Sequence, residues 1–429
     1  MITLNDDQIQ CKIDILDAVN TSMPFYTIQG AAGVGKTTLV AHVIENIPMG
    51  KTICIATPTH KATKVARKMG IDRGIDGRVE YNTIHSVLGI KPTRKGGEEI
   101  YIKDKYVAEK VYDVLIIDEA SMLGDDVIEY ILECDSTTII FIGDKYQISP
   151  VNNGGRVSLA FTEVEDVSSL TKIVRYDNPI INLATSIRQS QDDKTNLPLF
   201  ETDLDERGQG VEVLNFKNWF SGLMKEFQSD KFQKSKDHCR VIAYTNASVD
   251  KINDKIRKTI HGDDVEEYII GDVVVAQRGH KRGEFKNSDE LEILDITELY
   301  DSDNGYDYWE LYVRSLEDFK LFRINVLKKT SQCKYDNRLS ELQKQAYKTL
   351  EGAAENWSKF WALMDMYFPV KHIYCCTAHK SQGSTFNNTY VFLKDFLNCY
   401  HLTENDSLEL KQLVYTAITR SSEKTLVNR

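Results

Sequence analysis

A loop able to hold a polyphosphate lies near the start of the chain. The stretch "GAAGVGKTT" has the spacing G-x-x-x-x-G-K-[ST], with Gly30, Gly35, Lys36 and Thr37 at the defining positions. Glycines let backbone N–H groups approach phosphate oxygens, and the lysine can reach the β- and γ-phosphates. The hydroxyl that follows can bind Mg²⁺. This spacing predicts a nucleoside triphosphate site; a chance glycine-rich turn is the alternative.

A pair of acids forms the second candidate group. "LIIDEASM" places Asp118 and Glu119 at the end of an apolar run. Downstream of a phosphate loop, an aspartate in this position holds Mg²⁺ directly or through water. A neighbouring glutamate can orient and deprotonate the attacking water. The alternative is a helix N-cap with an acidic first turn, and we favour the catalytic interpretation because the pair ends a strand.

Three further side chains could respond to the γ-phosphate. Gln147, in "IGDKYQISPV", could contact the γ-phosphate or the water. Charge that develops during phosphoryl transfer also needs cations, and Arg175 and Arg420 are the candidates. Both arginines are far from Lys36 in sequence, so they would come from a second domain that closes over the nucleotide. A turn polar residue and solvated surface arginines are the alternatives.

The elements that must position these groups have the pattern of a parallel α/β sheet. "FYTIQ" before the loop predicts a strand, and "TTLVAHVIENI" after it predicts a helix whose N-terminus faces the phosphates. "TICIATP", "DVLIIDEA" and "TTIIFIGD" are short apolar runs that end in polar or small residues. Strands buried on both faces have this composition, with functional residues just past their carboxyl ends.

Two segments interrupt this pattern. "GIKPTRKGGEEIYIK" has two short arms around Gly96-Gly97, which predicts a projecting hairpin. Strand-like runs from about 267 to 326 predict a small antiparallel barrel, and apolar residues every three or four positions from 339 to 367 predict a helix or helix pair. After Pro369 the α/β pattern resumes.

Composition limits the class of protein. A chain of 429 residues is long enough for two or three domains, and 41% hydrophobic with 27% charged residues is typical of a soluble globular protein. We find no secretory signal and no run long enough to span a membrane. Eight cysteines without metal-like spacing favour a reducing cytoplasm. The net charge of −11 argues against a globally basic nucleic-acid binder but allows a local groove.

The order of these motifs resembles that of superfamily-1 DNA helicases, in the branch of phage Dda and RecD-like enzymes and within it the Dda type. The matching stretches span Gly30 to Glu423. They are "GAAGVGKTT", "ATPTHKA", "TIHSVLG", "LIIDEASM", "IGDKYQISPV", "VIAYTNASVDKIN", "TAHKSQGSTF" and "QLVYTAITRSSE". "TAHKSQG" and "YTAITR" together are far more specific than the phosphate loop alone, although "HKSQG" by itself could be a polar turn after a strand.

The resemblance implies an α/β fold of two RecA-like P-loop NTPase domains, with a β-hairpin insertion in the first and a small β-barrel plus helical insertion in the second. The expected boundaries are 1–87 and 112–170 for the first RecA-like domain, 88–111 for the hairpin, 171–266 and 370–429 for the second RecA-like domain, 267–335 for the barrel and 336–369 for the helical insertion.

The resemblance also implies a role for individual residues. Lys36 and Thr37 would bind phosphate and Mg²⁺, with Asp118 as a second metal ligand and Glu119 as general base. Gln147 would couple the γ-phosphate to the DNA groove, and Arg175 and Arg420 would be arginine fingers. The expected nucleotide contacts are Gln8, which would read adenine, and Gly30, Ala31, Ala32, Gly33, Val34, Gly35, Lys36, Thr37 and Thr38. The expected DNA contacts are Pro58, Thr59, His60, His85, Tyr101, Asn246, His379, Lys380 and Gln382.

The function implied is an ATP- and Mg²⁺-dependent helicase that moves 5′ to 3′ on single-stranded DNA and unwinds duplex, in phage replication, recombination or repair. Its expected partners are single-stranded DNA, DNA forks and a single-strand DNA-binding protein, with no membrane. It would be a monomer in the cytoplasm, that of the host if a phage encodes it. The alternatives are a translocase that displaces proteins from DNA, a phosphate-loop kinase and an ATP-switched binding module.

Overall fold

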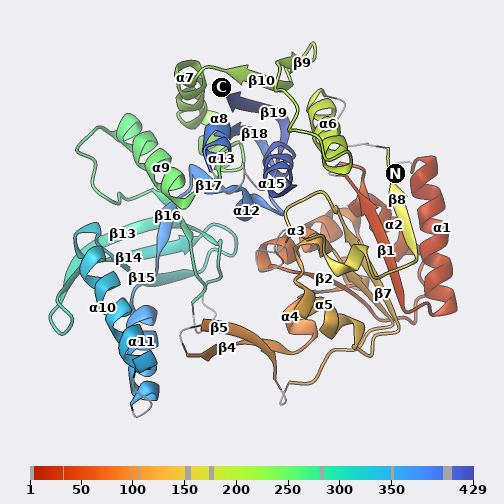
Figure 1. Ribbon diagram of the computed structural model, residues 1–429, viewed down its shortest axis with the longest axis horizontal. Coiled ribbons are helices and arrows are strands. Elements are labelled where there is room, and N and C mark those ends of the chain that lie inside the picture. The colour runs from red at the N-terminus through yellow and green to blue at the C-terminus, as the bar shows by residue number, and fades with distance from the viewer. Residues whose placement is uncertain are drawn as a thin grey trace. The chain divides into compact units, whose positions relative to one another are not determined.

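The computed structural model describes residues 4–31, 33–96, 98–104, 107–149, 156–172, 178–280, 285–348, 352–399 and 408–429 (Figure 1). The chain forms two compact units. Unit 1 comprises Met1–Lys91, Lys103–Val249 and Cys376–Arg429, and unit 2 comprises Pro92–Ile102 and Asp250–Cys375. Both units are therefore assembled from segments that are distant in sequence.

Unit 1 contains two sheets, and the first carries the phosphate loop. Its strand order is β3-β2-β6-β7-β1-β8, and every described pairing is parallel. The strands are β1 (Phe25–Gly30), β2 (Ile53–Thr57), β3 (Glu80–Thr83), β6 (Val114–Ile117), β7 (Thr138–Gly143) and β8 (Val167–Leu170). The helices connected with this sheet are α1 (Asp6–Thr21), α2 (Lys36–Asn46), α3 (His60–Arg73), α4 (Ile84–Val87) and α5 (Asp125–Leu132).

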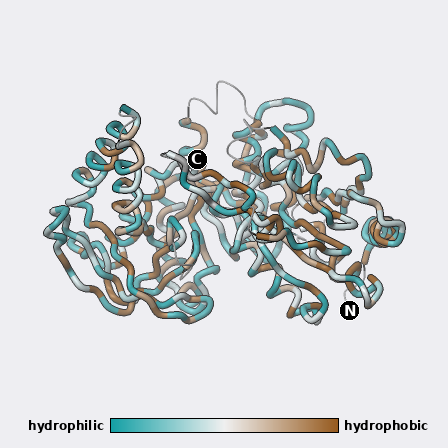
Figure 2. The backbone as a smooth tube through the Cα atoms, turned by 90° about the horizontal axis from the view of Figure 1, so that it is seen from below, coloured by the Kyte–Doolittle hydropathy of each residue, from teal (hydrophilic) through white to brown (hydrophobic). Residues whose placement is uncertain are grey.

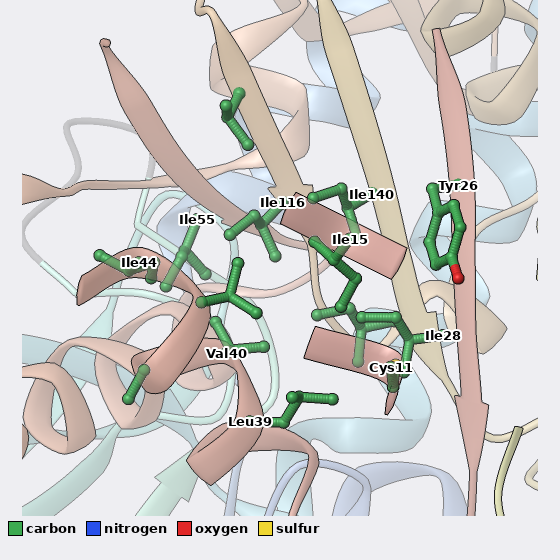
Figure 3. Close-up of a cluster of buried hydrophobic side chains, with 14 of the residues drawn as sticks. Cys11, Ile15, Tyr26, Ile28, Leu39, Val40, Ile44, Ile55, Ile116 and Ile140 are labelled. Carbon is green, nitrogen blue, oxygen red and sulfur yellow. The ribbon is translucent and has the colours of Figure 1, made fainter. Parts of the chain in front are cut away.

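A hydrophobic core fixes the helix that follows the phosphate loop. Leu39 and Ile44 of α2 are fully buried and belong to one cluster with Ile28, Ile116 and Ile140 of the sheet (Figure 3). Each buried aliphatic side chain contributes roughly 1.5–3 kcal/mol to stability. The start of α2, which bears the phosphate-binding side chains, is thus anchored to a rigid layer.

The second sheet has the order β17-β11-β18-β19-β10-β9. Its strands are β9 (Asp203–Leu204), β10 (Gly210–Leu214), β11 (Cys239–Ala243), β17 (Cys375–Thr377), β18 (Phe386–Val391) and β19 (Ser421–Asn428). The pairs β11–β18, β18–β19 and β19–β10 are parallel, and β9 is antiparallel to β10. Its helices are α6 (Ile180–Asp192), α7 (Phe216–Phe227), α8 (Asp230–Lys234), α9 (Asn246–His261), α12 (Ala378–Ser381), α13 (Leu393–Leu397) and α15 (Leu408–Ile418).

Unit 2 holds the predicted strand-rich and helical insertions. Five antiparallel strands lie in the order β15-β14-β13-β12-β16, with β15 and β16 at the edges among the described strands. A hydrogen bond also links the two edges: the N–H of Phe368, two residues before β16, donates to the carbonyl of Asn325 on β15 at 2.7 Å, and the small barrel stays a prediction. The strands are β12 (Val273–Ala276), β13 (Glu290–Asp301), β14 (Tyr306–Ser315), β15 (Leu321–Leu327) and β16 (Val370–His372). Helices α10 (Lys329–Lys348) and α11 (Ala353–Met366) pair with each other, as the apolar spacing allowed.

The projecting hairpin consists of β4 (Ile90–Lys95) and β5 (Glu98–Lys103). Gly96 has φ +61 in its turn, a left-handed conformation that suits glycine, whereas Gly97 lies outside the described residues. The strands are shorter than the predicted insertion, 88–111. The tip contacts α11: the Arg94 guanidinium makes two hydrogen bonds with the Asp365 carboxylate, at 2.8 and 2.6 Å, and lies over the ring of Trp361.

Hydrophobic segments are spread along the chain (Figure 2), and no disulfide links its cysteines. Hydrophobic and hydrophilic segments alternate along the tube in Figure 2. In the part of the chain that the structure describes, no helix has both the length and the apolar character needed to cross a membrane. All eight cysteines are free of disulfides, and Cys333 on α10 is exposed.

Candidate functional site

The phosphate loop connects β1 to α2. Gly33 and Gly35 have φ values of +83 and +78, and a Cβ on Gly35 would lie 2.6 Å from Nε2 of Gln8. The Lys36 ammonium donates hydrogen bonds to the carbonyl oxygens of Gly30 and Ala31, at 2.7 and 3.0 Å. The Lys36 ammonium therefore lies inside the curve of the loop. Phosphate oxygens of a bound nucleotide would compete with the two carbonyl oxygens for its hydrogen bonds. Ala32 lies outside the described residues.

Gln8 contacts the loop, but its amide is already engaged. Its Nε2 donates to the carbonyl oxygen of Val34 at 2.9 Å, and its Oε1 accepts from the N–H of Asn5 at 3.0 Å in a capping box at the start of α1. These bonds support the loop from behind. The adenine-reading role stays a prediction, and it would require Gln8 to exchange one of these bonds.

Oxygen ligands for a hard cation gather beside the loop. Thr37, Lys36 and Asp118 line one cavity, together with Arg73 of α3 and apolar side chains of α2, α3 and the sheet. Loss of solvation, and then the charge of Glu119, raise the pKa of Asp118 to about 6. A hydroxyl next to a carboxylate in a poorly solvated site matches the ligand preference of Mg²⁺, whose charge would keep that carboxylate ionised. The residues present therefore fit the metal.

Glu119 has a strained backbone. Its φ is +55, in the left-handed region, and its N–H donates to Oδ1 of Asp118 at 2.8 Å. A non-glycine residue held in a sparsely populated region costs about 1–3 kcal/mol, and such residues cluster at functional sites. This conformation turns the chain directly after Asp118, at the carboxyl end of β6. No feature of the residues around Glu119 indicates this conformation, because glutamate does not favour it.

Gln147 follows β7 of the first sheet, in a segment that also contacts the second sheet of unit 1. Gln147 is buried, and among the described residues its Oε1 has no hydrogen-bond partner. In the same segment, Asp144 accepts a hydrogen bond from the Tyr415 hydroxyl of α15 at 2.6 Å, and Ile148 packs in the core of the second sheet. The carbonyl of Ile148 accepts from Nε2 of Gln382 at 3.2 Å. A buried amide oxygen without a partner is suited to accept a hydrogen bond from a polar ligand.

Of the two candidate arginine fingers, the structure describes only Arg420. Arg420 is buried at the end of α15, where it donates to the carbonyls of Thr416 and Ser384 and to the Thr419 hydroxyl. It does not line the cavity beside Lys36. Its role as a finger stays a prediction that requires release from these bonds. Arg175 lies outside the described residues.

Threonine-capped turns follow four strands of unit 1, at the carboxyl ends where ligands bind α/β sheets. Thr59, Thr83, Thr245 and Thr377 each accept a hydrogen bond from an N–H in the first turn of the next helix. A histidine or asparagine stands one or two positions after each threonine: His60, His85, Asn246 and His379. The repeated pattern of threonine followed by histidine or asparagine is a signal that sequence reasoning missed.

The candidate DNA contacts lie on these turns, apart from Tyr101. Pro58, His85, His379, Lys380 and Gln382 are half-buried, whereas Thr59, His60 and Asn246 are exposed. Burial lowers the pKa of His85 and of His379, so both imidazoles are neutral near pH 7. Tyr101, on β5 of unit 2, is 49% exposed.

The turns of the two sheets meet within unit 1. A Cβ placed on Gly383, which follows "TAHKSQ", would lie 3.7 Å from the Cβ of Ala62 on α3. The segment after β17 therefore lies against the helix that starts at His60. A polar turn of the second sheet therefore lies beside one of the first, and we call the four threonine-capped turns the polar edge.

The first and last parts of the chain match two family models. Residues 3–203 match the model described as an AAA domain, and residues 372–427 match the UvrD-like helicase C-terminal domain. The ATP-dependent DNA helicase dda of Enterobacteria phage T4 is 29% identical over 95% of this chain and 94% of the relative. The resemblance to superfamily-1 helicases of the Dda and RecD-like branch is thereby confirmed.

Other relatives of this helicase agree. The RecD subunit of the RecBCD enzyme from Buchnera aphidicola (subsp. Schizaphis graminum) is 31% identical over 37% of this chain and 28% of that protein. A solved structure of Pif1 helicase on forked double-stranded DNA aligns with a TM-score of 0.53 at 17% identity, and covers 100% of this chain and 92% of that one. The predicted α/β fold with a RecA-like core is confirmed, and so is the prediction of an ATP-hydrolysing helicase.

Proposed function

We propose that this helicase moves 5′ to 3′ along single-stranded DNA and uses ATP and Mg²⁺ to separate duplex strands. The observation that carries the proposal is the edge of threonine-capped turns contributed by both sheets. The relatives named above include an ATP-dependent DNA helicase, and this supports DNA as the substrate. The direction rests on the resemblance to the Dda and RecD-like branch.

The chemistry of this edge suits a strand of any sequence. Hydroxyls, amides and main-chain N–H groups contact phosphates without reading bases, and flat imidazole rings can stack on them. Because His85 and His379 are neutral, few cations contribute to the grip. DNA affinity should therefore decline with salt by a modest slope, in keeping with the chain's net charge of −11.

Each residue of the nucleotide site has a separate task in this proposal. Lys36 would leave the carbonyls of Gly30 and Ala31 to hold the β- and γ-phosphates, while Glu119 takes a proton from the attacking water. Thr37 and Asp118 would hold Mg²⁺, which when bound neutralises charge on the phosphate oxygens. Gln147 would accept a hydrogen bond from the attacking water through its unsatisfied Oε1, or donate one to the γ-phosphate through its Nε2.

Coupling would pass through the segment Asp144–Ser149. Gln147 would sense the phosphate, while Ile148 and Asp144 of the same segment contact the second sheet. A change at Gln147 would therefore reach α15 through Asp144, three positions earlier, and Gln382 through Ile148, the next residue. This supports a hinge-type closure in which the two sheets alternate their grip on the strand.

The test is DNA-stimulated ATPase activity followed by unwinding of tailed duplexes of both polarities. We expect single-stranded DNA to raise the ATPase rate, and only the substrate with a 5′ single-stranded tail to be unwound. A kinase would be indifferent to DNA. A translocase that only displaces proteins would be stimulated by DNA but would leave the fork intact, and unwinding from 3′ tails alone would reverse the direction.

The hairpin is the proposed wedge between the strands. Tyr101 and Ile102 on β5 are exposed, and the tip is fixed to α11 by Arg94 and by a hydrogen bond from Trp361 Nε1 to the Gly96 carbonyl at 3.0 Å. A base-pair step holds roughly 1.4 kcal/mol of stacking, and one aromatic stacked on a base offsets about 1–3 kcal/mol. A surface loop with no role in separation is the alternative.

Replacing Arg94–Glu98 by a two-residue turn should sharply reduce duplex unwinding and spare the ATPase stimulated by single-stranded DNA. The shortened hairpin loses its anchor on α11 and can no longer hold an aromatic side chain rigidly against a terminal base pair. Both rates are measured on one preparation. Undiminished unwinding would move the wedge to another part of unit 2.

We also propose, from the resemblance, that the helicase works as a monomer in the cytoplasm, that of the host if a phage encodes it. A single-strand DNA-binding protein would share its DNA, in replication, recombination or repair. Displacement of proteins from DNA is the second candidate activity, favoured by the polar edge, which needs no fork to engage a strand.

A further inference from the structure

One carboxylate outside the recognised motifs organises the turn before α9. Asp395 lies on the short helix α13, which follows β18. Strands β11 and β18 are parallel neighbours, with Ile242 opposite Val391. Their carboxyl ends therefore open side by side, and α13 begins next to Tyr244 and Thr245.

The carboxylate of Asp395 collects donors from this turn. Its Oδ2 accepts from the N–H groups of Tyr244 and Thr245, at 2.8 and 2.7 Å, and its Oδ1 accepts from the hydroxyls of Thr245 and Ser248, at 3.0 and 2.5 Å. Each of these donors is neutral. Hydrogen bonds to an ionised acceptor are roughly twice as strong as those between neutral groups, so the turn is fixed firmly.

This turn is part of the polar edge. Thr245 caps α9, whose first residue is the exposed Asn246, and the N–H of Ser248 donates to Thr245 Oγ1 at 3.1 Å. The ring of Tyr244 lies near that of Phe396, at a centroid distance of 5.9 Å, and near that of His379, at 6.4 Å. Asp395 thus controls two candidate strand contacts, Asn246 through the cap and His379 through Tyr244.

We propose that Asp395 is a positioning residue for the strand grip of the second sheet. It does not touch the strand. It holds the backbone of Tyr244 and Thr245 so that Asn246 and His379 present one surface, and it occupies main-chain N–H groups that would otherwise attract a phosphate into the turn. The inference rests on the proposed DNA-translocating function.

The test compares Asp395→Ala with Asp205→Ala. Asp205 is a matched control because its carboxylate also fixes a turn of unit 1, by accepting from the N–H groups of Arg207 and Gln209 at 2.9 and 2.8 Å. We expect Asp395→Ala to raise the concentration of oligo(dT) needed for half-maximal ATPase stimulation by about tenfold or more, the scale of a displaced contact. The DNA-independent ATPase rate should stay within about twofold, and Asp205→Ala should change neither quantity.

Milder variants separate positioning from folding. Asp395→Asn keeps one acceptor oxygen and Ser248→Ala removes one donor, so both should fall between the parent and Asp395→Ala. In the double variant Asp395→Ala/Asn246→Ala the two effects should be less than additive, because one acts through the other. If Asp395→Ala does not fold, the ranking of the two milder variants carries the test.

The outcomes are distinct. If the parent enzyme is not stimulated by oligo(dT), the proposed function fails and the inference fails with it. If the parent is stimulated and the Asp395 variants keep its half-maximal concentration, Asp395 only stabilises the fold and the inference alone is overturned. Tighter binding by Asp395→Ala would also overturn it, since the carboxylate would then act as a repulsive charge.

Discussion

Glu119→Gln should slow ATP hydrolysis by about 10²–10⁴-fold, the usual contribution of a general base, while nucleotide affinity stays near that of the parent. The substitution removes proton-accepting ability but keeps the size of the side chain and the left-handed backbone at φ +55. The N–H of residue 119 can still donate to Oδ1 of Asp118. Single-turnover hydrolysis and the binding of a fluorescent ATP analogue measure the two quantities separately.

Glu129→Gln is the matched control, because Glu129 is an exposed glutamate on α5 connected with the same sheet. It should leave hydrolysis and the melting temperature unchanged. Hydrolysis by Glu119→Gln at the parent rate would show that another group accepts the proton. A large loss of nucleotide affinity would instead place Glu119 among the phosphate contacts.

Lys36→Ala should abolish measurable hydrolysis and unwinding together, with a loss of at least about 10²–10³-fold in ATPase rate. The Lys36 ammonium is the cation that the loop holds against the carbonyls of Gly30 and Ala31. Without it, the β- and γ-phosphates lose their fixed positive partner in the ground state and in the transition state. ATPase and fork-unwinding rates on one preparation test this result.

The control for this variant is Lys68→Ala, which removes an exposed lysine from α3. It should keep both activities. Because α2 is anchored by a buried apolar face, Lys36→Ala should unfold at close to the parent temperature. Unwinding that continues without hydrolysis, or hydrolysis at the parent rate, would contradict the assignment of Lys36.

The sequence predicted the site where chemistry imposes a local pattern. A phosphate loop needs glycines, a lysine and a hydroxyl at set spacing, so Gly30 to Thr37 could be identified without coordinates. The acids after β6 were found in the same way. The left-handed backbone of Glu119 was not, since it results from the turn that the surrounding structure imposes on an ordinary residue.

Contacts between distant segments could not be predicted. Asp395 is one aspartate among many, and only the pairing of β11 with β18 brings it to Thr245. Arg94 and Asp365 likewise carry no mutual signal in sequence. Closure of the five strands of unit 2 into the predicted barrel also lies beyond the sequence, because strand runs indicate β structure but closure depends on which edges pair.

The anchored hairpin has a consequence for how the chain folds. Arg94 and Asp365 are 271 positions apart, so the ends of a very long loop must meet before their ion pair can form. The entropy of closing such a loop is lost before the contact compensates for it, and contacts of this kind form late and slow folding. A nascent chain would complete the first sheet with its hairpin still unsupported. The hairpin should become rigid only after α11 has been synthesised and packed, which makes its anchoring a late step in the maturation of the enzyme.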